Sequence, residues 1–150
     1  MKRLALFLPL LLMGCTNDVE ENKLAYLEYK NQLQEQTIFD DEDTEFNTYF
    51  NIARKNEEIV DYSIIINNAN IDMYNVKALL IHDYVYEEAF PSVGIMDEPV
   101  NLLKDSDDKI ILNGTIQTND DISNVKFKLY LEYVDSDGFE NEIYYQVARG

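Results

Sequence analysis

The sequence predicts a mainly β protein in which an antiparallel β-sandwich follows a single helix. The first observation is the period of the apolar residues, which recur at every second position from Phe46 onward, as in strands that bury one face. The second is spacing, because six such segments follow one another at intervals of about 10 to 15 residues with turns between them. The third is residues 19–36, which lack Gly and Pro and are rich in helix-forming residues.

The predicted helix at residues 19–36 is imperfectly amphipathic. Aromatic and apolar residues share one side at helical spacing, namely Ala25, Tyr26, Tyr29 and Leu33. Leu24 and Leu27 fall nearly opposite. We expect the tyrosine side to pack on the domain or the helix to act as a spacer. The alternative is a helix that binds a partner or forms a coiled coil.

Residues 37–45 are interpreted as a solvated linker. This stretch carries five acidic residues, Asp40, Asp41, Glu42, Asp43 and Glu45. Like charges repel one another and keep such a run extended in water. The alternative interpretation is a cation site.

Six strands are expected from the alternation of apolar and polar residues. The last two form a hairpin around the turn Asp135-Ser136-Asp137-Gly138. Asn113 and Gly114 are kept within one continuous strand, because a turn there would leave very short segments on either side. The expected strands are residues 46–53, 60–66, 74–86, 110–118, 125–133 and 143–147.

The strand at residues 74–86 is the longest apolar and aromatic run of the domain and is apolar on both faces. Such a strand is predicted to lie in the middle of a sheet or to bend between two sheets. His82, the only histidine of the chain, lies inside it. A zinc site would need further histidine or cysteine ligands, so His82 is expected to be a hydrogen-bonded structural residue.

Residues 87–108 break the strand period, and Pro91, Gly94 and Pro99 punctuate them. Long irregular loops often carry function. The candidate binding residues are therefore the apolar side chains Phe90, Val93, Ile95 and Met96. The alternative is a crossover between two sheets whose apolar residues plug the open end of the core.

The sequence contains no motif of an enzyme, a metal site or a cofactor site. It has no Gly-rich phosphate loop and no G-x-S-x-G nucleophile motif. The acids around Asp135 do not match an EF-hand, which requires Asp or Asn at the position of Phe139. Asp97 and Glu98 are interpreted as surface residues rather than a catalytic pair. We expect no catalytic activity, no cofactor and no bound metal.

The start of the chain has the pattern of an export signal. Lys2 and Arg3 supply positive charge, residues 4–13 are apolar, and Gly14 precedes Cys15, the only cysteine. The apolar run is ten residues long, whereas a membrane-spanning helix needs about 20. A permanent transmembrane helix is therefore not expected.

The residues Leu12-Met13-Gly14-Cys15 resemble the lipobox of bacterial lipoproteins. The resemblance implies that residues 1–14 are a removed signal peptide and that the Cys15 thiol is diacylated. It also implies a lipid-anchored protein of the cell membrane that faces the outside of the cytoplasm. Two acyl chains give stable anchoring where a single chain does not. The alternatives are a secreted protein cut near Gly14 and an uncleaved signal anchor.

Cleavage before Cys15 leaves residues 15–45, with the lipidated cysteine, helix and linker, and residues 46–150, the sandwich. It removes Lys2 and Arg3 and no acid, so 10 basic and 29 acidic residues remain, a net charge of −19. This charge excludes a nucleic-acid footprint and repels anionic headgroups, so membrane contact is expected through the lipid on Cys15. A flexible chain from Cys15 to Glu45 would span about 30 Å.

The strand pattern over residues 46–150 resembles the immunoglobulin-like domains of bacterial surface lipoproteins. The alternative is a small α+β fold in which the helix covers one sheet. Because no catalytic motif is present, the first hypothesis is a non-catalytic lipoprotein whose sandwich binds another exported protein or supports an envelope assembly, with contacts made by the loop from Phe90 to Met96 and by tyrosines on strand faces. The alternative function is a solute- or cation-binding lipoprotein whose acidic field concentrates positive ligands.

Overall fold

The computed structural model describes residues 14–41, 45–85 and 88–149. Within these residues the chain forms one helix, α1 (Gly14–Glu35), followed by eight strands. The predicted antiparallel β-sandwich with one preceding helix is confirmed. The strands are β1 (Asn47–Arg54), β2 (Ile59–Asn67), β3 (Met73–His82), β4 (Ser92–Val93), β5 (Val100–Leu102), β6 (Ile110–Gln117), β7 (Phe127–Val134) and β8 (Glu140–Gln146).

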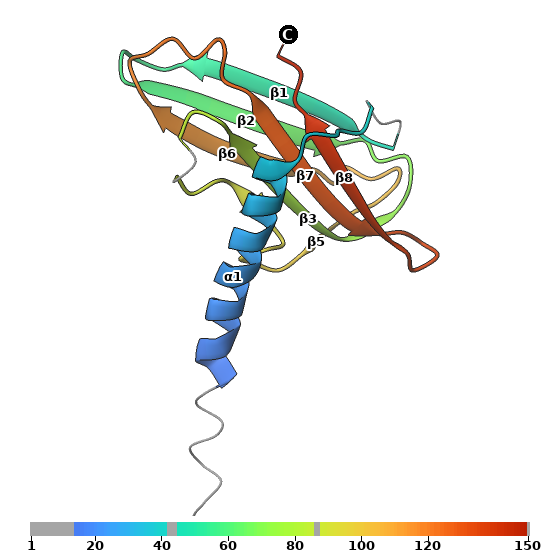
Figure 1. Ribbon diagram of the computed structural model, residues 1–150. Helices are drawn as coiled ribbons and strands as arrows, with labels where there is room; N and C mark the ends of the chain where they lie inside the picture. Colours follow the sequence, from blue (N-terminus) through green and yellow to red (C-terminus); the bar gives the residue numbers. More distant parts are fainter. Residues whose placement is uncertain (1–13, 42–44, 86–87, 150) are drawn as a thin grey trace, which may run out of the picture.

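The strands form two antiparallel sheets (Figure 1). The first sheet has the order β1-β2-β6, and the second has the order β4-β3-β7-β8 with β5 also paired to β3. The six predicted strands correspond to β1, β2, β3, β6, β7 and β8. The short strands β4 and β5 lie within the stretch that was expected to be irregular, where two and three residues respectively pair with β3.

Turn and bulge positions follow the asparagine and glycine residues. Asn68 and Gly138 adopt positive φ in the turns after β2 and β7, a conformation that Asn and Gly tolerate. Asn75 has a φ of 52° inside β3, where the register with both β5 and β7 shifts. This β-bulge allows β3 to pair with both β5 and β7 although the register shifts along the strand.

The main core lies between the two sheets. Alternate residues of β2 point into it, so that Val60, Tyr62, Ile64 and Ile66 are buried while the residues between them are only half-buried. Gly114 faces this core from β6, and a side chain there would collide with the ring of Tyr62. Because glycine leaves that room, β6 continues through position 114 as one strand, as predicted.

The strand β3 is buried on both faces, as its sequence predicted. Val76, Ala78 and Leu80 belong to the core between the sheets. Leu79 and Ile81 belong to a second, smaller core on the opposite face. The predicted end of this strand at Tyr86 lies outside the described residues, and the strand ends at His82.

The helix α1 covers this second core and forms a third layer. Leu33 is fully buried there, and Tyr26 and Tyr29 pack against it, so the expected packing of the tyrosine side is confirmed. The other half of α1, towards Gly14, projects away from the sheets (Figure 1). Only the C-terminal half of the helix is therefore bound to the sandwich.

The chain after α1 is attached to β8 at Asp40. The Asp40 main-chain nitrogen donates to the Tyr144 carbonyl at 2.8 Å, and the Asp40 carboxylate accepts from the Tyr144 nitrogen at 2.9 Å. This part of the expected solvated linker therefore does not extend freely from the domain. The acids Glu42 and Asp43 lie outside the described residues.

Candidate functional site

The four residues of the predicted binding loop do not form a common surface. Phe90 and Ile95 are each 5% exposed and lie in the small core beneath α1. Val93 is half-buried against the main core, and Met96 alone is well exposed, at 41%. Phe90 and Ile95 are thus out of reach of a partner while α1 is in place. They fill the space beneath the helix, not the open end of the sandwich.

The helix is fixed to this loop by the Tyr26 hydroxyl. It accepts a hydrogen bond from the Phe90 nitrogen at 2.6 Å and donates one to the Phe90 carbonyl at 3.0 Å. Lys30 adds a cation–π contact 5.2 Å from the centre of the Phe90 ring. These contacts hold the loop against the helix and explain why its apolar residues are covered.

His82 is a core residue. Its side chain is 1% exposed and its ring lies against Tyr62, Phe90 and Phe127. Nδ1 accepts a hydrogen bond from the Tyr84 nitrogen, and Nε2 lies 3.2 Å from the Glu88 carboxylate. Burial lowers the pKa of His82, and Glu88 opposes that shift. The expected structural role is confirmed.

A second set of contacts holds the C-terminal half of α1. The Lys128 ammonium, from β7, donates to the carbonyl oxygens of Leu33, Gln34 and Gln36 at 3.4, 2.8 and 3.0 Å. These groups lie at the carbonyl end of the helix, where a cation is favoured by the helix dipole and by unpaired acceptors. The last turn of α1 has no basic residue of its own, and Lys128 of the sandwich supplies the positive charge that caps it.

Tyrosine hydroxyls add a buried polar contact between α1 and the sheet. Tyr29 and Tyr130 both donate to the same oxygen of Glu132, each at 2.8 Å. Burial raises the pKa of both tyrosines, and the hydrogen bond to Glu132 raises it further. The tyrosines are therefore held in their neutral, donating form.

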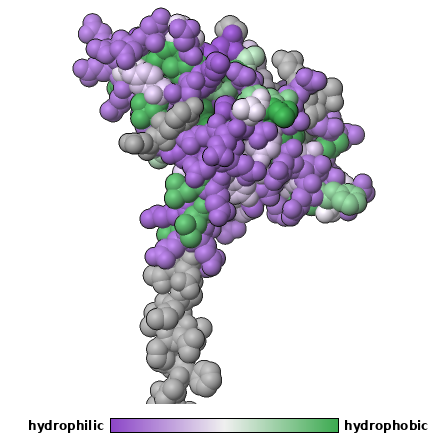
Figure 2. Space-filling view, in the orientation of Figure 1, coloured by the Kyte–Doolittle hydropathy of each residue, from purple (hydrophilic) through white to green (hydrophobic). Residues whose placement is uncertain are grey.

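Cys15 is the second residue of the described part of α1, and its side chain is not among those described. At 1.5 Å per residue, its main chain stands about 16 Å along the helix axis from Tyr26. The side chains of residues 18–24 are exposed, and apolar residues are visible on this projecting part of the helix (Figure 2). Within the described residues, no helix is both long and apolar enough to cross a membrane.

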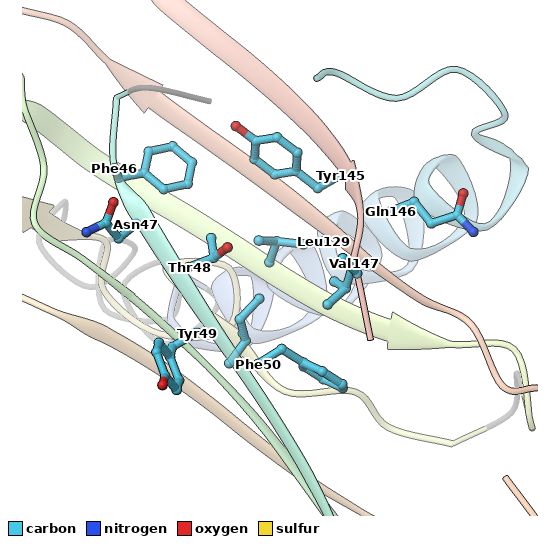
Figure 3. Close-up of a pocket in the computed structure, with 11 residues that line it drawn as sticks. Phe46, Asn47, Thr48, Tyr49, Phe50, Leu129, Tyr145, Gln146 and Val147 are labelled. Atoms are coloured by element: carbon cyan, nitrogen blue, oxygen red, sulfur yellow. The ribbon is translucent and has the colours of Figure 1, made fainter. Parts of the chain in front are cut away.

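A groove lies between β1 and β8. Its volume is about 490 Å³, and Phe46 and Tyr145 meet edge to face across it with ring centres 5.9 Å apart (Figure 3). Thr48 is exposed although it points to the inner side of β1 (Figure 3), which shows that the sandwich is open here. The aromatic and apolar lining consists of Phe46, Tyr49, Phe50, Ile64, Leu129, Tyr145, Val147 and Ala148.

The groove is bordered by two edge strands. Among the described residues, β1 pairs only with β2, and β8 pairs only with β7. The register of β1 with β2 runs without a shift from Asn47 to Arg54. The strand contains no proline, and Arg54 at its end is its single charged residue. Natural edge strands are usually protected by such residues or by bulges. The free edge of β1 is therefore suited to pair with another extended segment.

Sequence reasoning missed this groove. Phe46, Thr48 and Phe50 alternate like residues of any half-buried strand, and alternation does not show which strands lie at a sheet edge. Within the part of the chain that the structure describes, no three His, Cys, Asp or Glu residues gather as a metal site would require.

Comparison with known proteins identifies no family for the chain. No model of a known protein family matches it, and no curated protein matches it. Among solved structures it is similar to the sporulation control protein Spo0M from Bacillus subtilis, with 11% identity and a TM-score of 0.30. The match covers 70% of this chain and 49% of Spo0M, so the chain spans about half of that protein. A similarity this weak carries no argument about fold or function.

Proposed function

We propose that the protein is a non-catalytic, lipid-anchored lipoprotein that presents its sandwich outside the cytoplasm and binds an extended segment of another exported protein. The anchor is the lipid on Cys15, as the lipobox-like residues 12–15 imply. Within the described residues, α1 runs from Gly14 to Glu35 and is bound to the sandwich from Tyr26 onward. A lipid at Cys15 would thus be joined to the domain by a continuous helix rather than by a free chain.

The observation that carries the binding function is the free edge of β1 beside an apolar groove. An extended segment can pair its main chain with β1 and place alternate side chains in the groove. Aromatic rings from both sheets line the groove, and aromatic residues are frequent anchors of binding interfaces. After cleavage the chain has 10 basic and 29 acidic residues, and its net charge of −19 favours neutral or basic partner segments.

A small solute in the same groove is the second candidate function. The groove volume of about 490 Å³ falls within the range of small-molecule sites, roughly 300 to 1,000 Å³. Its lining side chains are uncharged, which favours an apolar solute over a cation. A bound protein segment would form main-chain hydrogen bonds with the edge of β1, whereas a small solute would occupy only the groove.

Anchoring is tested by comparing the natural protein with Cys15→Ala in intact cells. The natural protein is expected in the membrane fraction and to incorporate an alkyne-labelled fatty acid. The Cys15→Ala protein is expected to remain unlabelled. If Cys15→Ala is labelled and retained like the natural protein, the assigned anchor is wrong.

Partner binding is tested with a photo-crosslinking amino acid at Thr48, inside the groove. The matched control carries it at Ser136, an exposed turn position between β7 and β8. We expect Thr48 alone to crosslink one exported protein in intact cells, with the link mapped to an extended segment. A synthetic peptide of that segment should then bind the purified protein and should lose binding to Thr48→Lys. Crosslinks equal at both positions, or none at Thr48, would contradict the proposal.

A further inference from the structure

Among residues 14–41, 45–85 and 88–149, no helix packs on the outer face of the β1-β2-β6 sheet. The helix α1 packs on the other sheet, on the opposite side of the sandwich (Figure 1). Residues of β1 alternate between the two faces, and Tyr49 lies on the side of the strand opposite Thr48 and Phe50 (Figure 3). The strand register aligns the outward residues in rows across the sheet.

One of these rows is apolar. Tyr49 pairs with Ile65, which pairs with Ile111, so the three side chains lie side by side across the three strands. Tyr49 is 75% exposed and Ile111 is 42% exposed. With strands about 4.8 Å apart, the row is roughly 10 Å long. It forms a flat apolar strip that ends in a tyrosine ring.

The next row along the strands is polar and uncharged. It consists of Asn51, Ser63 and Asn113, aligned by the same register. Amide and hydroxyl groups supply both donors and acceptors of hydrogen bonds. A depression of about 350 Å³ lies at this row and is also lined by Asp61 and Thr115. Thr115 donates to one carboxylate oxygen of Asp61 at 3.0 Å, which leaves the second oxygen as an acceptor.

This face differs in charge from the rest of the molecule. Charged residues make up 27% of the chain. The apolar row, the polar row and the row that contains Ala53, Asp61 and Thr115 hold nine residues, of which Asp61 is the single charged one. Because a cationic ligand would find stronger attraction elsewhere on so acidic a surface, this face fits an uncharged ligand.

We propose that this face binds a neutral glycan chain. A sugar ring has an apolar face of C–H groups and an edge of hydroxyls that both donate and accept hydrogen bonds. The apolar row matches the ring face, with Tyr49 as a stacking platform, and the polar row matches the hydroxyls. The rows lie about 7 Å apart along the strands, so a sugar residue lying on the apolar row has its edge over the amides.

The size of the face favours a glycan over a folded protein. Three strands of about eight residues span roughly 10 by 25 Å, which is well below the approximately 800 Å² that each partner buries in a stable protein complex. Two copies of this chain would also bring like net charge together. Tyr49 also lines the β1–β8 groove, whereas Ile65, Ile111 and Asn113 belong to this face alone. The Asn113→Ala variant therefore separates this assignment from the function proposed for that groove.

The proposal is tested with the full-length protein in a zwitterionic detergent, titrated by calorimetry with neutral hexasaccharides of glucose, mannose or N-acetylglucosamine. Saturable binding to at least one is expected, with no binding of a hexamer of galacturonic acid. Tyr49→Ala should weaken binding at least tenfold, and Asn113→Ala should weaken it several-fold. Phe139→Ala, which removes another exposed aromatic ring at 68% exposure, is the matched control and should leave binding unchanged.

Three results would overturn the glycan proposal. They are an absence of binding to every neutral hexasaccharide, equal binding of the galacturonic acid hexamer, and binding that Tyr49→Ala leaves unchanged. The alternative occupant is a second copy of this chain, and analytical ultracentrifugation tests it. A dimer of the natural protein that Tyr49→Ala abolishes would assign the face to that second copy. Tyr49 is exposed, so its variant should unfold at the same temperature as the natural protein.

Discussion

The Tyr26 hydroxyl pairs with both main-chain groups of Phe90, accepting from its nitrogen at 2.6 Å and donating to its carbonyl at 3.0 Å. These two residues lie 64 positions apart in the sequence. The Tyr26 hydroxyl thus makes the two main-chain hydrogen bonds that a neighbouring strand would otherwise make to Phe90. This contact joins the helix, the loop and the small core.

Tyr26→Phe is expected to destabilise the protein by about 1–3 kcal/mol, because it leaves partly buried donor and acceptor groups of Phe90 unpaired while keeping the ring. Chemical denaturation measures the loss. Hydrogen exchange should also accelerate at the Phe90 amide. Tyr49→Phe is the control, since that hydroxyl is on an exposed side chain. Equal stability of Tyr26→Phe and the natural protein would show that these hydrogen bonds contribute nothing net.

Lys128→Met is expected to lower the free energy of unfolding by about 1–2 kcal/mol, because the carbonyl end of α1 loses its cation. The methionine keeps most of the apolar stem of the lysine and lacks its charge. Lys126→Met is the matched control, since Lys126 is exposed on the same segment. Hydrogen exchange should rise in the last turns of α1 in the first variant and stay unchanged in the second. A similar response of both variants would point to a general charge effect instead of a cap.

Stability should fall as the pH rises above about 10. The folded protein raises the pKa values of Tyr29, Tyr62 and Tyr130 above the ordinary tyrosine value of 10.0, chiefly through burial. Above that pH the unfolded chain releases these protons while the folded protein retains them, so the free energy of unfolding decreases. Denaturant unfolding from pH 8 to 11 measures the slope, which should be shallower in Tyr130→Phe. A flat profile to pH 11 would contradict these shifts.

Gly114→Ala is expected to destabilise the protein by about 1–3 kcal/mol through overpacking. The new methyl group meets the ring of Tyr62, which is 3% exposed and lies against His82 and Phe127. A double variant that adds Tyr62→Leu should lose less stability than the two single variants together. Strict additivity would mean that position 114 is not limited by the tyrosine ring.

Much of the fold follows from sequence patterns because burial imposes a period on the residues. Apolar residues on both faces of residues 74–82 required cover on two sides, and the structure provides the opposite sheet and α1. The spacing of Tyr26, Tyr29 and Leu33 indicated which side of the helix would pack. The hairpin around Gly138 followed from its turn residues.

The functional surfaces were less accessible to sequence reasoning because they depend on which elements become neighbours. Phe90 and Ile95 look like exposed loop residues until α1 covers them. In the sequence, Thr48 has the pattern of any strand residue, and only the strand order shows that β1 is an edge strand. Tyr49, Ile65 and Ile111 form a row only through pairing between strands that are distant in sequence. The period of apolar residues within one strand does not show which other strands lie beside it.

The exposed start of α1 has a consequence for release from a membrane. The side chains of residues 18–24 are exposed, whereas the contacts that fix the helix begin at Tyr26. With a lipid on Cys15, a single proteolytic cut within residues 18–24 would detach the sandwich and leave its core, its groove and its outer sheet face intact. The same protein would then exist in two populations, one bound to the cell and one shed into its surroundings, with the same binding surfaces.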